Sequence, residues 1–421
     1  MPDSLEAWLA HIERQHAQPI VLGLERLREV QQRLKQRKSC PVFIVGGTNG
    51  KGSVCAMLER ILLCAGYRVG LYTSPHLLRY NERVRIDGHP VADEPLCTGF
   101  VCVEAARQDT PLTYFEFGTL AAWEVFAQYS LDAIILEVGL GGRLDAVNIY
   151  DPDCAVVTTV DLDHMDFLGD SREQIGFEKA GIFCAGKPAI CGDPQPPATL
   201  QAHAAKIGAD LQVLGKDFGF VNQDVQWQYW GRSGKRSSLA HPGLRGGNQL
   251  QNASIALAAL DTLRDRIPVV MQDIRRGLLE VELAGRFQVL PGRPTVVLDV
   301  AHNPQAARVL AENLGNMAFH PETWAVFGML RDKDVGAVIG ALKGRVTRWL
   351  PCALEGPRAM PADELVQRLR EYGATGELTP FASPAAAFAY AKEQAEEDDR
   401  ILTFGSFLTV ADVMRVLERA A

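Results

Sequence analysis

The stretch from Pro41 to Ser53 reads PVFIVGGTNGKGS and decides the fold of the N-terminal half. Its apolar part, Pro41–Gly46, is typical of a buried strand that ends in glycines. Apolar residues then recur at helical spacing, and Gly66 ends the helical segment: Val54, Met57, Leu58, Ile61 and Leu62. A strand, a glycine-rich turn and a helix in this order predict a loop that binds nucleotide phosphates through Thr48, Asn49, Gly50, Lys51, Gly52 and Ser53.

Further apolar runs on either side of this loop predict more strands of the same sheet. The central-strand candidates are Arg68–Thr73, Ala133–Val138 and Ala155–Val160. Polar or glycine-rich residues follow each of them, at the edge where ligand sites lie in open α/β sheets. A Gly-, Trp-, Tyr- and Ser-rich region from Lys216 to Arg245 predicts a small hairpin, and Asn248–Leu263 predicts an Ala-rich helix. We therefore expect an α/β fold with a mostly parallel sheet around the phosphate loop.

The length of 421 residues favours two domains. The stretch Gly285–Pro294, GRFQVLPGRP, is the best linker candidate. After it, strand candidates alternate with helical segments: Thr295–Val300, Trp324–Gly328, Trp349–Ala353 and Ile401–Gly405. We predict a P-loop domain over 1–285 and a smaller Rossmann-like α/β domain over 286–421.

Composition excludes several classes of protein. Hydrophobic residues make up 47% and charged residues 22%, as in an ordinary globular enzyme. The net charge of −8 argues against a nucleic-acid partner, and no apolar run is long enough to span a bilayer. The polar N-terminus does not resemble a secretory signal, and the nine cysteines form no CxxC pair. We expect a cytoplasmic protein with reduced thiols.

The phosphate loop departs from the commonest pattern in one respect. Gly52 follows the lysine, where a Ser or Thr would normally reach a magnesium ion. Polar residues at three strand ends are candidate ligands instead: Ser74, Glu137 and His164. Glu137 ends an apolar strand, where an unpaired carboxylate would be costly and a magnesium ion would relieve the cost. By chemistry alone, His164 is equally well a hydrogen-bonded loop histidine, and Ser74 a turn serine before Pro75.

Lys179, in the segment GFEKAGIF, has two interpretations. It is either a surface lysine on a helix or a buried lysine whose pKa falls, because burial disfavours the charged amine. A neutral amine could take up carbon dioxide and become a carbamate, an anionic ligand for a second metal ion. The sequence alone does not decide between them.

Several short motifs, taken in order, resemble one family. They are GTNGKGS, TSPHL, TYFEF, LEVGLGGRLDAVN, DHMDFLG, EKAGIF, GRFQ, DVAHNP, GMLRDKD and GSF. The set resembles the folylpolyglutamate synthases of the Mur ligase superfamily, and most closely the bacterial members that are bifunctional with dihydrofolate synthase. The resemblance runs from about Leu24 to about Val410.

The resemblance implies a role for many of these residues. In the family, glycine after the loop lysine is normal. The first magnesium ion is held by residues matching Ser74, Glu137 and His164, and a carbamylated lysine matching Lys179 holds a second. Further implied nucleotide contacts are Asn252, Arg286 and Asp299. Without the resemblance, Asn252 would be taken as a helix-surface amide and Arg286 as a surface charge in the linker.

The resemblance also implies a substrate site. The pterin contacts of bifunctional members match Thr113, Tyr114, Phe115 and Glu116, together with Leu144, Asp145 and Ala146. The motif TYFEF is otherwise typical of the start of an amphipathic helix with core aromatics. His302 and Ser406 are candidate contacts for glutamate or phosphate, although strand-end polar residues often only cap the next helix.

The expected activity is an ATP-dependent ligation of L-glutamate to dihydropteroate and to reduced folates. The pterin carboxylate would attack the γ-phosphate to give an acyl phosphate, and glutamate would then displace phosphate. Lys51, Lys179 and His164 are the expected catalytic residues, and the partners are these small molecules and no nucleic acid or membrane. We expect a monomer. The alternatives are a monofunctional folylpolyglutamate synthase, a cell-wall Mur ligase, a simple phosphotransferase and a nucleotide-gated binding protein without catalysis.

Overall fold

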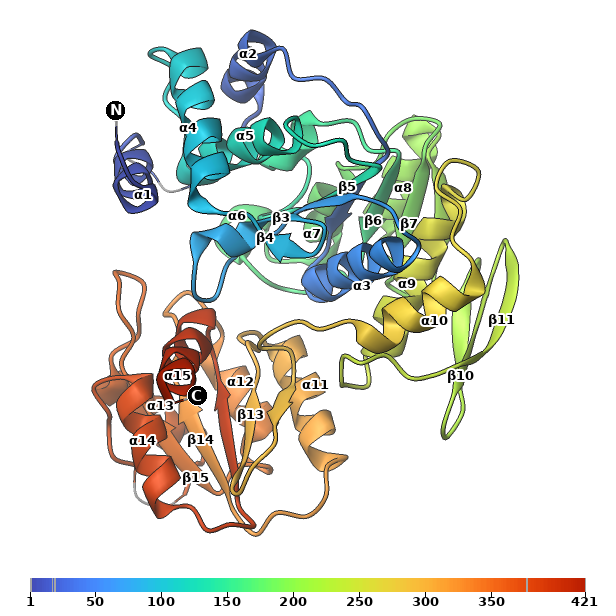
Figure 1. Ribbon diagram of the computed structural model, residues 1–421. Helices are drawn as coiled ribbons and strands as arrows, with labels where there is room; N and C mark the ends of the chain where they lie inside the picture. The colour runs from blue at the N-terminus through green and yellow to red at the C-terminus, as the bar shows by residue number, and fades with distance from the viewer. Residues whose placement is uncertain (1, 17, 19, 376–377, 421) are drawn as a thin grey trace. The chain divides into compact units, whose positions relative to one another are not determined.

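The computed structural model describes residues 2–16, 18, 20–375 and 378–420 (Figure 1). It divides into two compact units, which are described separately. Unit 1 comprises Met1–Gly243 and Leu250–Val281, and unit 2 comprises Leu244–Gln249 and Glu282–Ala421. Within the described ranges, no helix combines the length and the apolar character needed to cross a membrane.

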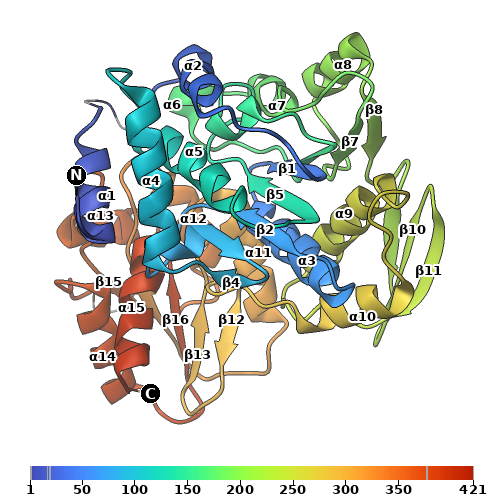
Figure 2. The same ribbon diagram turned by 45° about the horizontal axis from the view of Figure 1, so that its top comes forward.

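Unit 1 is built on an eight-stranded sheet with the order β4-β3-β2-β5-β1-β6-β7-β8 (Figure 2). Strands β2, β5, β1, β6, β7 and β8 run parallel, and β3 and β4 are antiparallel additions at one edge. The strands are β1 Val42–Gly46, β2 Val69–Tyr72, β3 Val84–Ile86, β4 His89–Pro90, β5 Ala133–Glu137, β6 Cys154–Val157, β7 Pro188–Cys191 and β8 Asp210–Val213. Strand β1 lies between β5 and β6, so the phosphate loop leaves the middle of the sheet.

Helices cover both faces of this sheet. They are α1 Leu5–Glu13, α2 Glu25–Leu34, α3 Lys51–Cys64, α4 Asp93–Arg107, α5 Tyr114–Phe126, α6 Met165–Leu168, α7 Arg172–Ala180, α8 Ala198–Ile207, α9 Gln249–Thr262 and α10 Met271–Glu280, with 3₁₀ turns η1 Tyr80–Arg83 and η2 Ala146–Ile149. Val42 and Ile44 join one continuous core with buried residues of α4, α5, α7 and α8. Phe43 and Val45 alternate with them along the strand, are equally buried and lie outside that core, so they face the side on which α3 packs.

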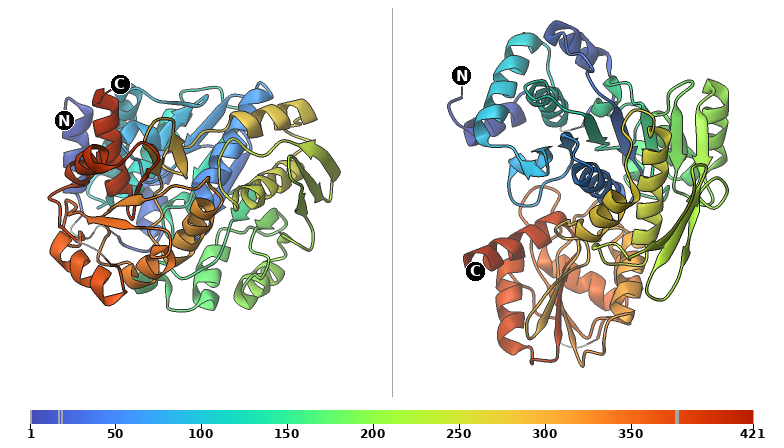
Figure 3. Two further views of the ribbon diagram at one scale, coloured as in Figure 1. Left: turned by 90° about the horizontal axis from the view of Figure 1, so that it is seen from below. Right: turned by 45° about the vertical axis from the view of Figure 1, so that its right-hand side comes forward.

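A small antiparallel sheet with the order β11-β10-β9 belongs to the same unit. Its strands are β9 Gly219–Asn222, β10 Trp227–Gly231 and β11 Gly234–Leu239. In Figure 3 it stands beside α9 and α10. The hairpin predicted for this region is therefore extended by a third strand.

Unit 2 contains a five-stranded sheet with the order β12-β13-β16-β14-β15. The strands are β12 Gln288–Leu290, β13 Thr295–Leu298, β14 Thr323–Phe327, β15 Arg348–Pro351 and β16 Arg400–Phe404. All pair in parallel except β12. The helices are α11 Pro304–Gly315, α12 Val335–Leu342, α13 Ala362–Glu371, α14 Pro384–Gln394 and α15 Phe407–Ala420. Its own core joins β13, β14 and β16 to α11, α12 and α13.

Two predicted segments differ from the structure. The predicted linker Gly285–Pro294 is wrong in part, because β12 lies within it and pairs with β13, with Val289 opposite Val297. Gly292, at φ 152°, lets the chain turn back into β13, so the glycine that suggested a linker belongs to a hairpin. The strand predicted over Ala155–Val160 ends at Val157, because the next residues bind the phosphate loop instead of continuing the sheet.

Candidate active site

The phosphate loop connects β1 to α3 at the carboxyl end of the sheet. Gly47 and Gly50 have φ of 140° and 87°, values that favour glycine. A side chain at Gly47 would overlap Thr158, and a Cβ at Gly50 would come within 2.6 Å of Oδ1 of Asn252. The ammonium group of Lys51 donates to the carbonyl oxygens of Gly47 at 2.9 Å and Thr48 at 3.2 Å. The lysine is thus folded over the loop, as a phosphate-binding lysine requires.

The segment that follows β6 holds the loop from one side. The Thr48 amide donates to the carbonyl oxygen of Thr159 at 2.8 Å, and the Asn49 amide donates to Oγ1 of Thr159 at 3.1 Å. The hydroxyl of Thr158 donates to the Asn49 carbonyl oxygen at 2.6 Å. The Asp161 amide donates to Oγ1 of Thr48 at 3.0 Å. The loop and residues 158–161 therefore form one hydrogen-bonded structure.

Glu137 and Ser74 lie together at the ends of β5 and β2, as the sequence predicts. The Glu137 side chain is buried, with 4% of its surface exposed. Its Oε2 accepts hydrogen bonds from the hydroxyl of Thr73 and from the Ser74 amide, the latter at 3.3 Å. Among the described residues, no lysine, arginine or histidine forms an ion pair with this carboxylate. A buried carboxylate without a protein cation fits a divalent metal ion, which would supply the missing positive charge.

His164 is the residue before α6 and has left-handed backbone angles, φ 52° and ψ 41°. Its amide donates to Oδ1 of Asp163 at 2.9 Å, and its Nε2 lies 4.0 Å from the same oxygen. The described part of the chain contains no cluster of three His, Cys, Asp or Glu side chains suited to a metal ion. The predicted set of a serine, a glutamate and a histidine is sparse, which suits magnesium because that ion keeps several waters.

Lys179, on the last turn of α7, is buried with 4% of its surface exposed. Of the two interpretations of its sequence, the buried one is correct. Burial lowers the pKa of Lys179 to about 7, and the positive charge of Lys51 lowers it further, while Asp163 and Asp145 oppose this. Among the described residues its amine has no ion-pair partner. A fraction of the amine is therefore neutral near neutral pH, the form that reacts with carbon dioxide.

The loop after β5 carries the predicted residues Leu144, Asp145 and Ala146. Asp145 is buried and caps η2: its carboxylate accepts from the Leu140 amide at 2.7 Å and from the Val147 amide at 3.0 Å. Burial raises its pKa to about 7, although these hydrogen bonds and Lys51 oppose the shift. The Phe115 ring packs directly on Gly139 of the same loop. The structure thus joins two of the predicted substrate segments.

Thr113 and Glu116 form a capping box at the start of α5. The Glu116 carboxylate accepts from the Thr113 amide at 2.8 Å and from both Nε (3.2 Å) and Nη2 (2.6 Å) of Arg26. Its oxygens are thus used within the chain. The segment TYFEF does start a helix, but most residues of α5 are buried, so the helix is not amphipathic as the alternative interpretation assumed. A role of these residues in substrate binding remains a prediction.

Tyr114, the first residue of α5, lies beside a cation that sequence reasoning missed. The Arg83 guanidinium stacks on the ring of Tyr114 at 5.5 Å and on that of Tyr80 at 5.4 Å, and it donates to Nδ1 of His76 at 2.8 Å. Arg83 forms no ion pair with a carboxylate of the described residues. Arg83 follows the motif TSPHL, in the stretch TSPHLLRYNER from Thr73 to Arg83, but only the fold brings it to Tyr114.

Asn252 is buried, so its interpretation as a helix-surface amide is wrong, and backbone amides of unit 2 bind Asp299. Asn252 is buried on α9 against Gly50. In unit 2, Asp299 follows β13 and accepts from the Phe287 amide at 2.8 Å and the Ala301 amide at 2.7 Å. Burial raises the pKa of Asp299 to about 6, and the charge of Arg286 opposes the shift.

Arg286 and His302 share an aromatic neighbour that sequence reasoning did not single out. The Arg286 guanidinium lies 5.0 Å from the ring centre of Phe407, and the His302 and Phe407 ring centres are 6.1 Å apart. Ser406 accepts a hydrogen bond from the Leu408 amide at 3.2 Å and so contributes to the start of α15. Unit 2 therefore brings Arg286, Asp299 and His302 to one edge of its sheet.

Two family models match the chain. The model "Mur ligase middle domain" covers residues 45–260, and "Mur ligase, glutamate ligase domain" covers residues 285–407. The first match contains the phosphate loop, Glu137, His164 and Lys179. The second contains Arg286, Asp299 and His302.

Curated proteins and solved structures agree with these models. The dihydrofolate synthase/folylpolyglutamate synthase of Escherichia coli (strain K12) is 45% identical, over 98% of this chain and 96% of that protein. The solved structure of E. coli FolC in complex with DHPP and ADP covers 100% of both chains, with a TM-score of 0.94 and 44% identity. A bifunctional folylpolyglutamate synthase/dihydrofolate synthase with Mn, AMPPNP and L-glutamate bound covers 99% of this chain and 98% of that one, with a TM-score of 0.91 and 43% identity.

Proposed function

The chain belongs to the Mur ligase family and, within it, to the dihydrofolate synthases/folylpolyglutamate synthases, and we propose on this premise that it joins L-glutamate both to dihydropteroate and to reduced folates at the cost of ATP. Membership makes it a ligase that forms carbon–nitrogen bonds. The relatives whose structures hold ADP, DHPP, an ATP analogue, manganese and L-glutamate support ATP, a divalent metal ion and these substrates.

The reaction proceeds in two steps. An oxygen of the substrate carboxylate attacks the γ-phosphorus of ATP, a new O–P bond forms, and the bond to the β-phosphate oxygen breaks to release ADP. The amino nitrogen of glutamate then attacks the acyl carbon and loses a proton. The C–O bond to phosphate breaks, and an amide and inorganic phosphate result.

The chain's own residues fit the needs of the first step. Lys51 and the amides of the phosphate loop stabilise the charge on the transferring phosphoryl group. Magnesium held by Ser74, Glu137 and His164 would neutralise phosphate charge. Thr113, Tyr114, Phe115, Glu116, Leu144, Asp145 and Ala146 would hold the pterin part of the substrate, with the Phe115 ring as an aromatic face. Asn252, Arg286 and Asp299 would contribute to nucleotide binding, and His302 and Ser406 to glutamate binding.

Lys179 is the observation that carries the proposal. A phosphotransferase needs the loop and one magnesium ion, but it has no need of a buried lysine beside Lys51. Because burial and Lys51 lower the pKa of Lys179 to about 7, its amine can take up carbon dioxide near neutral pH. We propose that the resulting carbamate, with His164, holds a second metal ion that lets a carboxylate approach the γ-phosphate.

The test is phosphate release that depends on glutamate, with dihydropteroate and tetrahydrofolate supplied separately. We expect release with each acceptor only when L-glutamate is present, and transfer of ¹⁸O from a labelled acceptor carboxylate to phosphate. Activity with tetrahydrofolate alone would indicate the monofunctional enzyme. Release of a phosphorylated product without glutamate would indicate a phosphotransferase, and nucleotide binding without turnover would leave a binding protein.

A further inference from the structure

The segment from Thr159 to His164 connects two parts of the proposed site. At one end, Thr159 and Asp161 bind the phosphate loop through the hydrogen bonds to Thr48 and Asn49 given above. At the other end stands His164, a proposed metal ligand, in a left-handed conformation that is uncommon for a residue with a side chain. Such a conformation persists only where neighbouring groups hold it.

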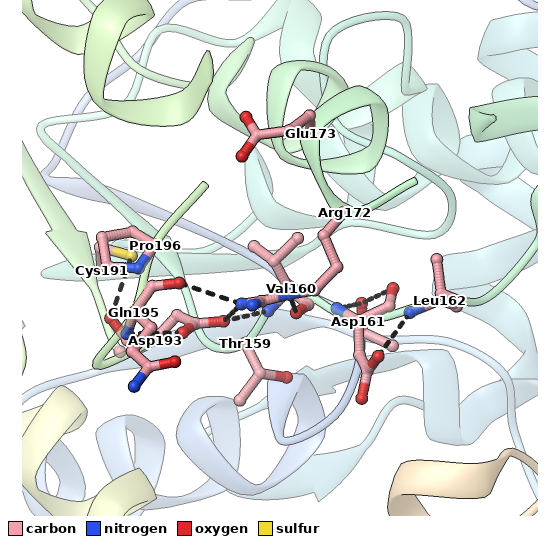
Figure 4. A network of polar contacts seen from close by, with 12 residues as sticks. Thr159, Val160, Asp161, Leu162, Arg172, Glu173, Cys191, Asp193, Gln195 and Pro196 are labelled. Carbon is pink, nitrogen blue, oxygen red and sulfur yellow. Dashed lines mark hydrogen bonds and ion pairs between the residues drawn. The ribbon is translucent and has the colours of Figure 1, made fainter. Parts of the chain in front are cut away.

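One ion pair holds the middle of this segment (Figure 4). The Val160 amide donates to Oδ2 of Asp193 at 3.0 Å, and the Val160 carbonyl oxygen accepts from Nε of Arg172 at 2.9 Å. Nη2 of Arg172 donates to the same Oδ2 of Asp193 at 2.8 Å. Both backbone polar groups of Val160 are therefore bound by the Arg172–Asp193 pair.

The pair also joins the elements on either side. Arg172 is the first residue of α7, the helix that ends with Lys179, and Asp193 follows β7. Oδ1 of Asp193 accepts from the Gln195 amide at 2.9 Å, and Nη2 of Arg172 donates to the Gln195 carbonyl oxygen at 3.1 Å. The segment, the helix of Lys179 and the end of β7 are thus bound at one point.

An exposed ion pair by itself contributes little, and the Arg172 side chain is 42% exposed. The Asp193 side chain is only 9% exposed, and it satisfies backbone groups that would otherwise lack partners. Loss of the pair therefore frees Val160, four residues before His164 and one after Thr159. The expected consequence is a shift of the segment.

We propose that Arg172 and Asp193 are positioning residues that keep the segment Thr159–His164 in register with the phosphate loop and thereby set the affinity for the metal–nucleotide complex. The inference rests on the proposed function for the role of His164. Neither residue touches the reacting atoms. Their effect passes through the backbone of Val160.

The test uses the full chain with Asp193→Asn and Arg172→Gln. The measurements are manganese affinity in the presence of ADP, by electron paramagnetic resonance, and the KM for Mg·ATP and for dihydropteroate. We expect each variant to weaken manganese binding and raise the KM for Mg·ATP by about tenfold, the range seen when groups behind a metal ligand are removed. The KM for dihydropteroate should change less than twofold. Hydrogen exchange of residues 159–168 should also become faster in the metal-free chain.

Asp153→Asn is the matched control. Asp153 precedes β6 at its amino end, is equally buried, binds Arg266 at 2.7 Å and accepts from the Val42 amide at 2.9 Å. Like Asp193, it is a buried carboxylate that accepts from a backbone amide and pairs with an arginine. It differs in lying at the end of β6 away from the phosphate loop and in pairing also with Lys38 and Lys187. The control should lower stability and leave both binding constants unchanged.

Equal binding constants in Asp193→Asn and Asp153→Asn would overturn the proposal and leave Arg172–Asp193 a stabilising contact only. If Asp193→Asn does not fold, Arg172→Ala decides, because it removes the donors to the Val160 carbonyl oxygen and to Asp193 and leaves the bond from the Val160 amide to Asp193 in place; unchanged manganese affinity in that variant overturns the proposal. Manganese–ADP binding is read without turnover. A chain without ligase activity would contradict the proposed function and still test this inference.

Discussion

Among the described residues, the Lys51 ammonium group hydrogen-bonds only to carbonyl oxygens of its own loop, those of Gly47 at 2.9 Å and Thr48 at 3.2 Å. Its charge is thus available to phosphate oxygens, and its removal should cost transition-state stabilisation rather than folding. We expect Lys51→Ala to lower kcat/KM for ATP by about a hundredfold or more. ADP formation checks the effect, and circular dichroism checks that the fold is intact. Near-normal ADP formation would contradict the prediction that this loop binds the phosphates of ATP.

Substitution of Lys179 tests whether this lysine carries a carbamate that binds a metal ion. Lys179→Ala removes the amine that would carry it, and the space left on α7 can admit a small anion. We expect activity to fall by about a hundredfold and to recover in part when acetate or formate is added, since either carboxylate could stand in as an oxygen ligand. Chloride at equal ionic strength should not restore activity, and Lys51→Ala should not respond to acetate. Full activity of Lys179→Ala without any added anion would contradict a catalytic role.

Asp153 permits a prediction about the element β6. Burial alone would raise the pKa of Asp153, but hydrogen bonds from Lys38, from the Val42 amide and from Arg266 outweigh it and lower the pKa to about 2. Because the pKa is lower in the folded chain than its ordinary value of 3.8, the ionised carboxylate stabilises the fold above about pH 4, and this stabilisation is lost as the pH falls through about 2.

We expect Asp153→Asn to lower the free energy of unfolding at pH 7 by about 1–2 kcal/mol, at roughly 1.4 kcal/mol per pKa unit reduced by the partial exposure of the cations. Urea unfolding of both proteins measures this difference in the free energy of unfolding. The difference between the two proteins should shrink as the pH is lowered below 4. A difference that does not change with pH would show that the carboxylate charge is not its cause.

Strands and loops differ in how well the sequence predicts them. The central strands are predictable because their apolar runs are short and end in polar residues, as at Glu137 and Ser74. Strand β12 is not, because its three residues lie among the glycines and prolines that also mark linkers. The contacts of Arg172 and Asp193 with Val160 could not be predicted from residue spacing. The two residues are 21 positions apart in the sequence, and only the pairing of β7 with β6 brings them together.

The residues of the candidate site also differ in how well the sequence predicts them. The residues Glu137 and Lys179 are recognisable as charges among apolar neighbours, and the structure places both in buried positions. The sequence around Arg26, Arg83 and Phe407 does not indicate which residues they contact. Their contacts with Glu116, Tyr114 and Arg286 depend on tertiary packing alone.

At the scale of the whole molecule, each unit has its own sheet and core. The effect of a ligand on hydrogen exchange can therefore be measured in each unit separately. A ligand that binds only the folded state stabilises what it contacts, by about 2.7 kcal/mol at a hundred times its Kd. The proposed nucleotide contacts lie in unit 1 at the phosphate loop and in unit 2 at Arg286 and Asp299. We therefore expect Mg·ADP to slow hydrogen exchange in β1 and β5 and also in β13 and β16, measured by mass spectrometry.

Arg286→Ala should separate the two effects. Strands β1 and β5 should keep their protection by Mg·ADP, because Lys51 and the loop amides are unchanged, while β13 and β16 should lose it. Arg348→Ala is the control, since Arg348 lies in unit 2 and pairs with Glu322 at 3.0 Å on an exposed surface. This control should behave as the unsubstituted chain does. If Mg·ADP leaves β13 and β16 of the unsubstituted chain unaffected, Arg286 and Asp299 do not bind the nucleotide, and the phosphate loop and Asn252 of unit 1 must account for its binding.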